Sequence, residues 1–272
     1  MSEIRPIVFN LSGVAEDDRF GQQHVSALMH IAPFISVKTF EDGSSQRLIG
    51  VDLTNSFVNP GSMIHDRVHT KGFYLDDVDV RMWLGDSIDN PDTRFLLQRE
   101  DPDPSQSNQG GSISTSSDFG VSGEVGVSGR SPSASIGASF SQSQSQSHEL
   151  KDFVFTSEST NLVLRHFYFM QQFGGGHYSG PRSLLVSGAT SGARLGELPL
   201  LSRARFPIFS KVIWGSVDDE GLNADFVRVS VELEGDFAIC EATNTFFNGV
   251  TFRDNVKQLI WTKSIDIPLP RP

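Results

Sequence analysis

The chain has 272 residues, a formal net charge of −11 and a hydrophobic fraction of 38%. This acidity argues against a nucleic-acid partner, because phosphates repel an acidic protein. It also gives no general attraction to anionic lipid. Cys240 is the single cysteine of the chain, so an internal disulfide framework is excluded. The length allows one large domain or two modest ones.

Two kinds of targeting segment are not predicted. No run of residues approaches the roughly 18 consecutive apolar positions that a transmembrane helix needs. The first residues, Met1–Phe9, lack a charged region followed by a long apolar one, so the sequence indicates no signal peptide.

The first hundred residues alternate between apolar and polar positions with a period of two, which predicts strands. The strands or strand pairs expected here are Ile4–Leu11, Val25–Phe40, Leu48–Phe57, Val78–Leu84 and Phe95–Arg99. A turn-rich stretch, Glu100–Gly111, then interrupts this folding pattern.

The next segment, Ser112–Ser147, predicts a β-hairpin with one apolar and one polar face. A turn at Gly129–Arg130 would pair Phe119 with Phe140 and bring all the apolar side chains onto one face. These apolar residues are Phe119, Val121, Val125, Val127, Ala134, Ile136, Ala138 and Phe140. The opposite face carries Asp118, Ser122, Glu124, Ser135 and Ser139.

Three interpretations of this hairpin remain open. An ordinary half-buried surface hairpin also alternates. A Ser-rich linker fits the composition, since 14 of the 36 residues from Ser112 to Ser147 are serine. A membrane-inserting hairpin explains both the strict parity and the small polar face, which would line water. The apolar band Phe119–Val127 also has about the length that a tilted strand needs to cross a bilayer. This third interpretation is favoured, with the apolar residues facing lipid and the polar ones facing the pore lumen.

Strand patterns resume after the hairpin. Short strands are predicted at Phe153–Phe155, Leu162–Met170, Leu184–Val186 and Lys211–Trp214. A longer pair is expected from Val227–Leu233 into Phe237–Ala242, joined by a turn at Glu234–Asp236, and the last strand is Lys257–Ile267. Many short strands with frequent turns predict an all-β fold, a β-sandwich interrupted by one inserted hairpin.

Several segments resemble the leukocidin/hemolysin superfamily of β-barrel pore-forming toxins, the alpha-hemolysin-like proteins. They are the Gly- and Ser-rich stem Ser112–Ser147 followed by Phe153–Phe155, the stretch Glu197–Leu201 with Phe206-Pro207 and Lys211–Ile213, and the ending Leu259–Ile267. The resemblance implies a leukocidin-like β-sandwich cap with a membrane-touching rim and a folded prestem. Residues 1–110 would form the N-terminal part of cap and rim, residues 111–148 the prestem hairpin, and residues 149–272 the remaining rim and the C-terminal part of the cap.

The same resemblance implies a secreted monomer that assembles into a homo-oligomer of seven or eight copies, with a second related subunit as a possible partner. Its target is a membrane lipid or a receptor on the target cell. The rim would fall near residues 58–85 and 168–196. There Trp83, Tyr178 and Arg182 are candidates for holding a lipid headgroup through cation–π and phosphate contacts.

Other chemistry finds little support in the sequence. His65 and His69 have the i, i+4 spacing of metal ligands only if the segment is helical, and it reads as loop or strand. The acidic residues between Asp76 and Asp89 match no EF-hand loop. No nucleophile-elbow sequence surrounds any serine. The chain is therefore expected to be no enzyme and to need no metal or cofactor. The alternative functions are an aerolysin-like toxin and a non-lytic β-sandwich lectin or adhesin.

Overall fold

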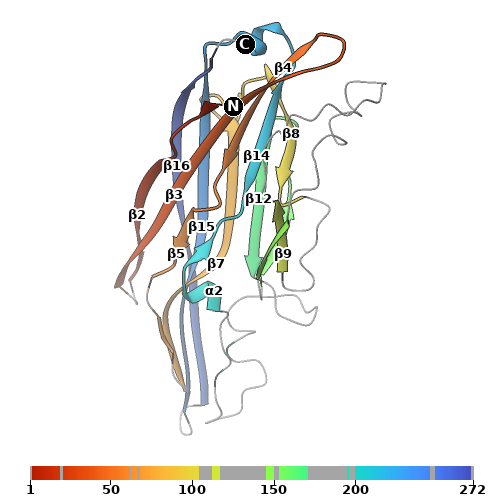
Figure 1. Cartoon of the computed structure of the whole chain (residues 1–272). Coiled ribbons are helices and arrows are strands. Elements are labelled where there is room, and N and C mark those ends of the chain that lie inside the picture. The colour runs from red at the N-terminus through yellow and green to blue at the C-terminus, as the bar shows by residue number, and fades with distance from the viewer. Residues whose placement is uncertain are drawn as a thin grey trace.

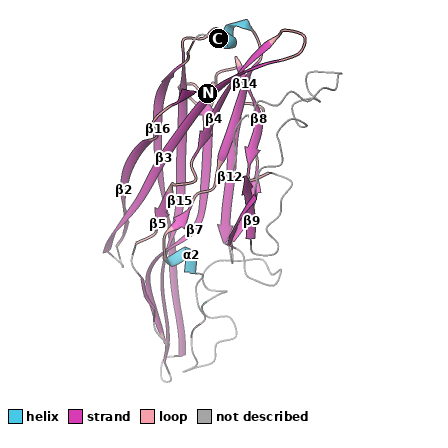
Figure 2. Ribbon diagram, viewed as in Figure 1, coloured by secondary structure: helices cyan, strands magenta, loops and turns pink. Residues whose placement is uncertain are grey.

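The computed structural model describes residues 2–18, 21–61, 63–65, 68–103, 112–116, 145–149, 153–170, 185, 195, 200–245 and 249–270. These residues form two large antiparallel sheets and one short two-stranded sheet (Figure 2). Both termini lie near one end of the molecule (Figure 1). The all-β prediction is confirmed.

The first sheet has eight strands in the order β13-β5-β3-β4-β14-β8, with β1 and β2 also paired to β3. Its strands are β1 (Ser2–Glu3), β2 (Ile7–Asp17), β3 (Gly21–Thr39), β4 (Ser45–Asp52), β5 (Phe57–Asn59), β8 (Phe95–Asp101), β13 (Phe206–Pro207) and β14 (Lys211–Ser216).

The second sheet has six strands in the order β11-β12-β7-β15-β16, with β6 also paired to β7. Its strands are β6 (Met63–His65), β7 (His69–Leu84), β11 (Phe153–Ser157), β12 (Val163–Met170), β15 (Phe226–Thr245) and β16 (Gly249–Pro268). In Figure 1, β7, β15 and β16 run past the other strands at the end away from the C-terminus.

The two sheets pack face to face around one apolar core, and two tryptophans bridge them. The indole N–H of Trp214 in β14 donates to the carbonyl of Leu162, which precedes β12, over 3.1 Å. The indole N–H of Trp261 in β16 donates to the carbonyl of Ser12 in β2, also over 3.1 Å. Each indole therefore buries a large ring while its polar group finds a partner in the opposite sheet.

The described helices are short. They are α2 (Leu200–Arg203) and α3 (Asp219–Leu222), the latter capped by Asp218, whose side chain accepts from the backbone N–H of Gly221. Within the described ranges, no helix has both the length and the apolar character needed to cross a bilayer. Cys240 is fully buried, which is typical of a free cysteine.

The predicted turn at Glu234–Asp236 is wrong. β15 continues through it as one strand of 20 residues, and a β-bulge between Asp236 and Phe237 shifts its register against β7. The extra residue of the bulge is Asp76 in β7, because Asp236 pairs with Asp77 and Phe237 pairs with Leu75. Beyond this point the buried positions of β15 change from odd numbers, as at Leu233, to even numbers, as at Ala242. A bulge and a turn both interrupt alternation, so the sequence pattern did not separate them.

Several other strand boundaries differ from the prediction. β7 begins at His69 and β16 at Gly249, in each case well before the predicted start. The expected strand Leu48–Phe57 is divided into β4 and β5, because Asp52 accepts from the backbone N–H of Thr54 and turns the chain. β8 extends through Glu100 and Asp101, which the sequence assigned to a break. Leu185, the described residue of the expected strand Leu184–Val186, is helical.

Candidate functional site

The inserted hairpin is described at its base, where β9 (Ser112–Ser116) pairs with β10 (Ser145–Glu149). The two strands are antiparallel, with Ser116 opposite Ser145 and Ser112 opposite Glu149. The described pairs therefore bring together the two arms that the sequence assigned to one hairpin.

The observed register differs from the predicted one by two residues. The predicted pairing of Phe119 with Phe140 would place Ser116 opposite position 143, whereas the structure places it opposite Ser145. Side chains alternate with a period of two, so a shift of two residues leaves every side chain on its predicted face. At the base, Ile113 and His148 share one face, and Ser114 and Ser147 share the other.

The remaining part of the hairpin lies outside the described residues. This includes every predicted lipid-facing residue and every predicted lumen residue: Phe119, Val121, Val125, Val127, Ala134, Ile136, Ala138 and Phe140, and Asp118, Ser122, Glu124, Ser135 and Ser139. Their roles remain predictions.

Of the three headgroup candidates, Trp83 lies in the described part of the chain. Its side chain is 3% exposed, and its neighbours across the sheet are Val163 in β12 and Ser230 in β15. A ring this deeply covered offers little surface to a lipid. Tyr178 and Arg182 lie outside the described residues.

A buried polar network joins the two large sheets through the strands that precede and follow the hairpin in sequence. We call its six members the root network: Glu100, Ser157, Ser159, His166, Ser210 and Tyr168. Glu100 Oε2 lies 3.0 Å from His166 Nε2, and His166 Nδ1 lies 3.0 Å from the Ser210 hydroxyl. The same carboxylate oxygen accepts from the hydroxyls of Ser157 and Ser159, at 2.9 and 2.5 Å.

The charges in the root network follow from burial. Burial lowers the pKa of His166 below its usual value, against the opposing effect of the nearby Glu100 carboxylate. Burial raises the pKa of Glu100, but hydrogen bonds from His166 and Ser159 outweigh this and hold it below its usual value. A neutral imidazole therefore donates from Nε2 to an ionised Glu100 and accepts at Nδ1 from Ser210. The Tyr168 hydroxyl, 3.2 Å from the Ser210 oxygen, completes the chain.

Ser210, His166 and Glu100 have the residue types of a hydrolytic triad, but not its accessibility. Ser210 and His166 are both 0% exposed, so no substrate carbonyl reaches the serine. The ring nitrogens are also reversed, because serine meets Nδ1 and the carboxylate meets Nε2. This arrangement holds structure together and offers no nucleophile to solvent.

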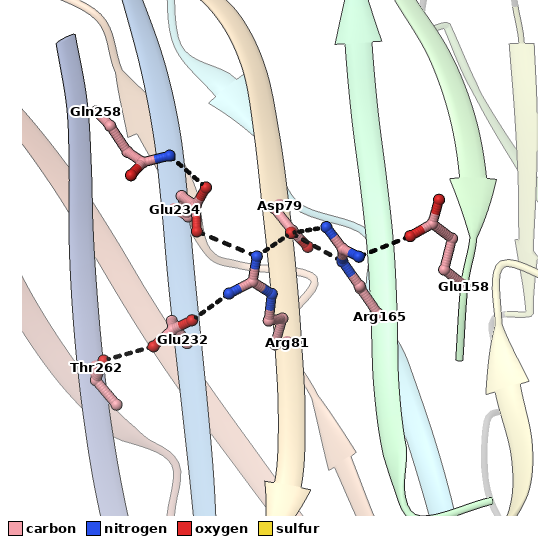
Figure 3. Close-up of polar contacts among 8 residues, drawn as sticks. All are labelled: Asp79, Arg81, Glu158, Arg165, Glu232, Glu234, Gln258 and Thr262. Carbon is pink, nitrogen blue, oxygen red and sulfur yellow. Dashed lines mark hydrogen bonds and ion pairs between the residues drawn. The ribbon is translucent and has the colours of Figure 1, made fainter. Parts of the chain in front are cut away.

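A ladder of charges covers the outer face of the second sheet (Figure 3). Asp79 in β7 is 2% exposed and receives hydrogen bonds from Arg81 at 2.6 Å and from Arg165 at 3.0 Å. Arg81 in turn pairs with Glu232 at 2.8 Å and Glu234 at 3.2 Å, both in β15. The ladder thus ties β12, β7 and β15 together on the face away from the core.

One row of the ladder has no arginine. Asp77 lies directly opposite Asp236, and the next row sets Asp79 opposite Glu234. Burial, then the charges of Asp236 and Asp76, raise the pKa of Asp77 to about 8. Burial also raises the pKa of Asp236. Like charges directly opposite each other across a sheet are destabilising, so protonation of a carboxyl in this row is favoured.

The sequence pointed to the acidic residues between Asp76 and Asp89 but did not predict their pairing with Arg81 and Arg165, and it did not reveal the root network. The sequence does contain a signal for a charged outer face. Charged residues alternate at Asp77, Asp79 and Arg81, and again at Glu232 and Glu234. The root network leaves no such signal, because its members come from four separate segments.

The metal-ligand candidates lie on neighbouring strands, not one turn apart on a helix. His65 in β6 lies opposite Thr70, one residue beyond His69 in β7. Among the described residues, no group of three or more His, Cys, Asp or Glu side chains is placed to hold a metal ion.

Comparisons with known proteins find likeness in structure alone. No protein-family model and no curated protein sequence matches the chain. Clostridium perfringens delta-toxin has a similar structure, with a TM-score of 0.56 and 11% identity over 97% of this chain and 90% of the toxin. A pore forming protein matches with a TM-score of 0.54 and 11% identity, over 98% and 96% of the two chains.

A third solved structure is the Clostridium perfringens NetB toxin in its membrane inserted form. Its TM-score is 0.50 and its identity 9%, over 97% of both chains. At these identities the likeness concerns the fold, and it extends over nearly the whole length of each molecule. The chain therefore has the all-β fold of the leukocidin/hemolysin-type toxins, as the resemblance in its sequence predicted.

Proposed function

We propose that the chain is a pore-forming cytolysin. The observation that carries the proposal is the pairing of Ser112–Ser116 with Ser145–Glu149, the base of the predicted hairpin. This hairpin is inserted into a fold that resembles those of known pore-forming proteins. One of these toxins has been seen in a membrane inserted form.

Physical chemistry requires several copies. Two strands in lipid leave unpaired N–H and C=O groups along both outer edges, each costing several kcal/mol in order of magnitude. Closing the strands into a barrel removes these edges. One hairpin cannot close, so each copy in a ring contributes one, and we propose a homo-oligomer of seven or eight copies.

The base of the hairpin supplies a register for the proposed barrel. Continued from Ser116 opposite Ser145, it sets Val121 opposite Phe140 and Val125 opposite Ile136. All four side chains then face lipid. The charged residues Asp118 and Glu124 then line the lumen.

The overall charge bears on the target. Because the net charge is −11, electrostatics does not favour adsorption to an anionic bilayer. We propose that a neutral headgroup or a receptor on the target cell provides the first contact, and that the protein acts outside the cell that makes it.

Calcein release from mixed-lipid liposomes, combined with negative-stain microscopy of the same liposomes, tests the proposal. We expect release together with ring-shaped particles. Intact vesicles without rings, across neutral, sterol-containing and glycolipid-containing bilayers and on intact target cells, would instead support a non-lytic binding protein. In planar bilayers, rings of Asp118 and Glu124 should give a modest cation preference in the reversal potential. Clear anion selectivity would contradict the lumen assignment.

A further inference from the structure

The root network joins the strands that flank the hairpin on both sides. Glu100 belongs to β8, the last strand before it, while Ser157 and His166 belong to β11 and β12, the first two strands after it. The partners lie 57 and 66 positions apart in sequence and are in direct hydrogen-bond contact.

The two arms of the hairpin are attached to the body by connections of unequal length. Ten residues, 102–111, separate β8 from β9, whereas three residues, 150–152, separate β10 from β11. Extended chain spans at most about 3.3–3.6 Å per residue, so the second connection reaches roughly 10 Å and the first more than 30 Å. The connection from β10 to β11 is therefore much the shorter of the two.

Glu100 links the strand before the hairpin to the two strands after it. Its carboxylate accepts from Ser157 and Ser159, and it meets His166, so the end of β8 is held against β11 and β12. The contact is buried: His166 is fully covered, and the Glu100 side chain is 9% exposed. Separating the strands would leave an ionised carboxylate without its donors. It would also move His166, whose ring centroid lies 4.9 Å from that of Phe155.

We infer that the root network is a joint that keeps β8, β11 and β12 together while the segment between them changes structure. Rearrangement then stops at the end of β8 on one side and at the start of β11 on the other, and the hairpin always starts from the same two strands. This inference rests on the proposed function, because it concerns what stays fixed during membrane insertion.

Amide hydrogen exchange on wild-type protein tests the joint directly. Exchange is followed in solution and after incubation with liposomes that release calcein. We expect protection in β8 (Phe95–Asp101) and β12 (Val163–Met170) to be kept in both states, while protection between Ser112 and Glu149 changes. Loss of protection in β8 or β12 on calcein-releasing liposomes would overturn the joint and leave the pore intact as a proposal. Wild-type protein that releases no calcein would refute the proposed function instead.

Variants distinguish a network that acts as a joint during insertion from one that only stabilises the folded protein. His166→Phe removes both ring hydrogen bonds but keeps an aromatic ring beside Phe155. We expect calcein release per bound protein to fall at least tenfold with binding unchanged. Arg47→Met is the matched control. It breaks a buried polar contact far from the hairpin, where the Arg47 guanidinium donates to the carbonyls of Ala224 and Pro270, and it should keep release within about twofold.

The double variant His166→Phe/Glu100→Gln completes the test. Replacing the carboxylate by an amide removes the buried charge that His166→Phe leaves unpaired, so the thermal midpoint should recover. If the network is a joint, calcein release stays low despite this recovery. Release that returns to within twofold of wild type would show that the network contributes stability alone, and the inference would be wrong. Should His166→Phe fail to fold, Ser159→Ala supplies the weaker perturbation for the same comparison.

Discussion

The sandwich body and the inserted hairpin are both built from alternating strands, but they specify register in different ways. In the body, large side chains interlock: Trp214 is fully buried and hydrogen-bonded across the sheets, and Asp79 is held between two arginines. At the base of the hairpin, Ser114 faces Ser147 and Ser116 faces Ser145. Serine against serine offers little that distinguishes one even-numbered shift from another.

The difference shows what alternation alone can determine. It fixes which face a side chain occupies, since a shift of one residue would exchange the faces. It does not fix the pairing partner, since a shift of two residues leaves every side chain on the same face. The body adds size and charge to alternation, and a register then becomes unique. If the segment refolds among several copies, as proposed, it needs each side chain to stay on its face more than it needs one fixed pairing.

The largest expected effect comes from placing a charge on the proposed lipid face. Val125→Arg should abolish calcein release, because an arginine facing lipid near the midplane costs roughly 2–4 kcal/mol per chain and is repeated in every copy. Ser135→Arg is the control. It carries the same charge on the proposed lumen face, where water solvates it, and should still release calcein. Equal release by both variants would contradict the assignment of faces.

The second prediction concerns the body. Trp214→Ala should lower the free energy of unfolding by about 3–5 kcal/mol, because it removes a large buried ring and leaves the Leu162 carbonyl without its donor. Chemical denaturation measures this loss. Val217→Ala, at a position that is 48% exposed, should change the same quantity by less than about 0.5 kcal/mol. Comparable losses of unfolding free energy in the two variants would mean that large buried side chains do not determine the strand register of the body.

These two regions also explain how far the sequence could be interpreted. Alternation was sufficient for the all-β fold and for buried strands such as Val227–Leu233. It failed at Glu234–Asp236, where a bulge produces the same break in pattern as a turn. It could not find the contact of Glu100 with His166, because that contact depends on how two sheets are stacked and not on either strand.

A third prediction concerns the row of the ladder that has no arginine, where Asp77 lies opposite Asp236. The pKa of Asp77 in the folded protein, about 8, lies above the usual value of 3.8, so the folded state holds a proton that the unfolded chain has lost. Its stabilising contribution is complete below pH 3.8 and is lost as the pH rises through about 8. Asp77→Asn removes this dependence. The variant should become more stable than wild type, with a difference that grows from about pH 4 to pH 8 and is then constant.

Thermal or chemical unfolding of both proteins between pH 4 and pH 9 measures that difference. Asp89→Asn, in an exposed loop, is the control and should follow the wild-type curve. A difference between Asp77→Asn and wild type that stays constant over the whole range would show that Asp77 is ionised throughout, and that the ladder neutralises this row as well.

The smallest expected energetic effect is also the most direct test of register. Ser114→Cys combined with Ser147→Cys places two thiols directly opposite each other, where Cα atoms lie about 4.5–5.5 Å apart, within the range that a disulfide bridges. Ser114→Cys combined with Ser145→Cys tests the register that the sequence predicted, and those thiols are diagonal in the structure, about 7–8 Å apart. The first pair should oxidise faster under mild oxidant, and neither change should alter the unfolding free energy of the reduced protein by more than about 0.5 kcal/mol. Equal oxidation rates would mean that the base of the hairpin samples both even-numbered registers, because serine pairs discriminate between them too weakly. Faster oxidation of the second pair would instead show that the predicted register is the preferred one in solution.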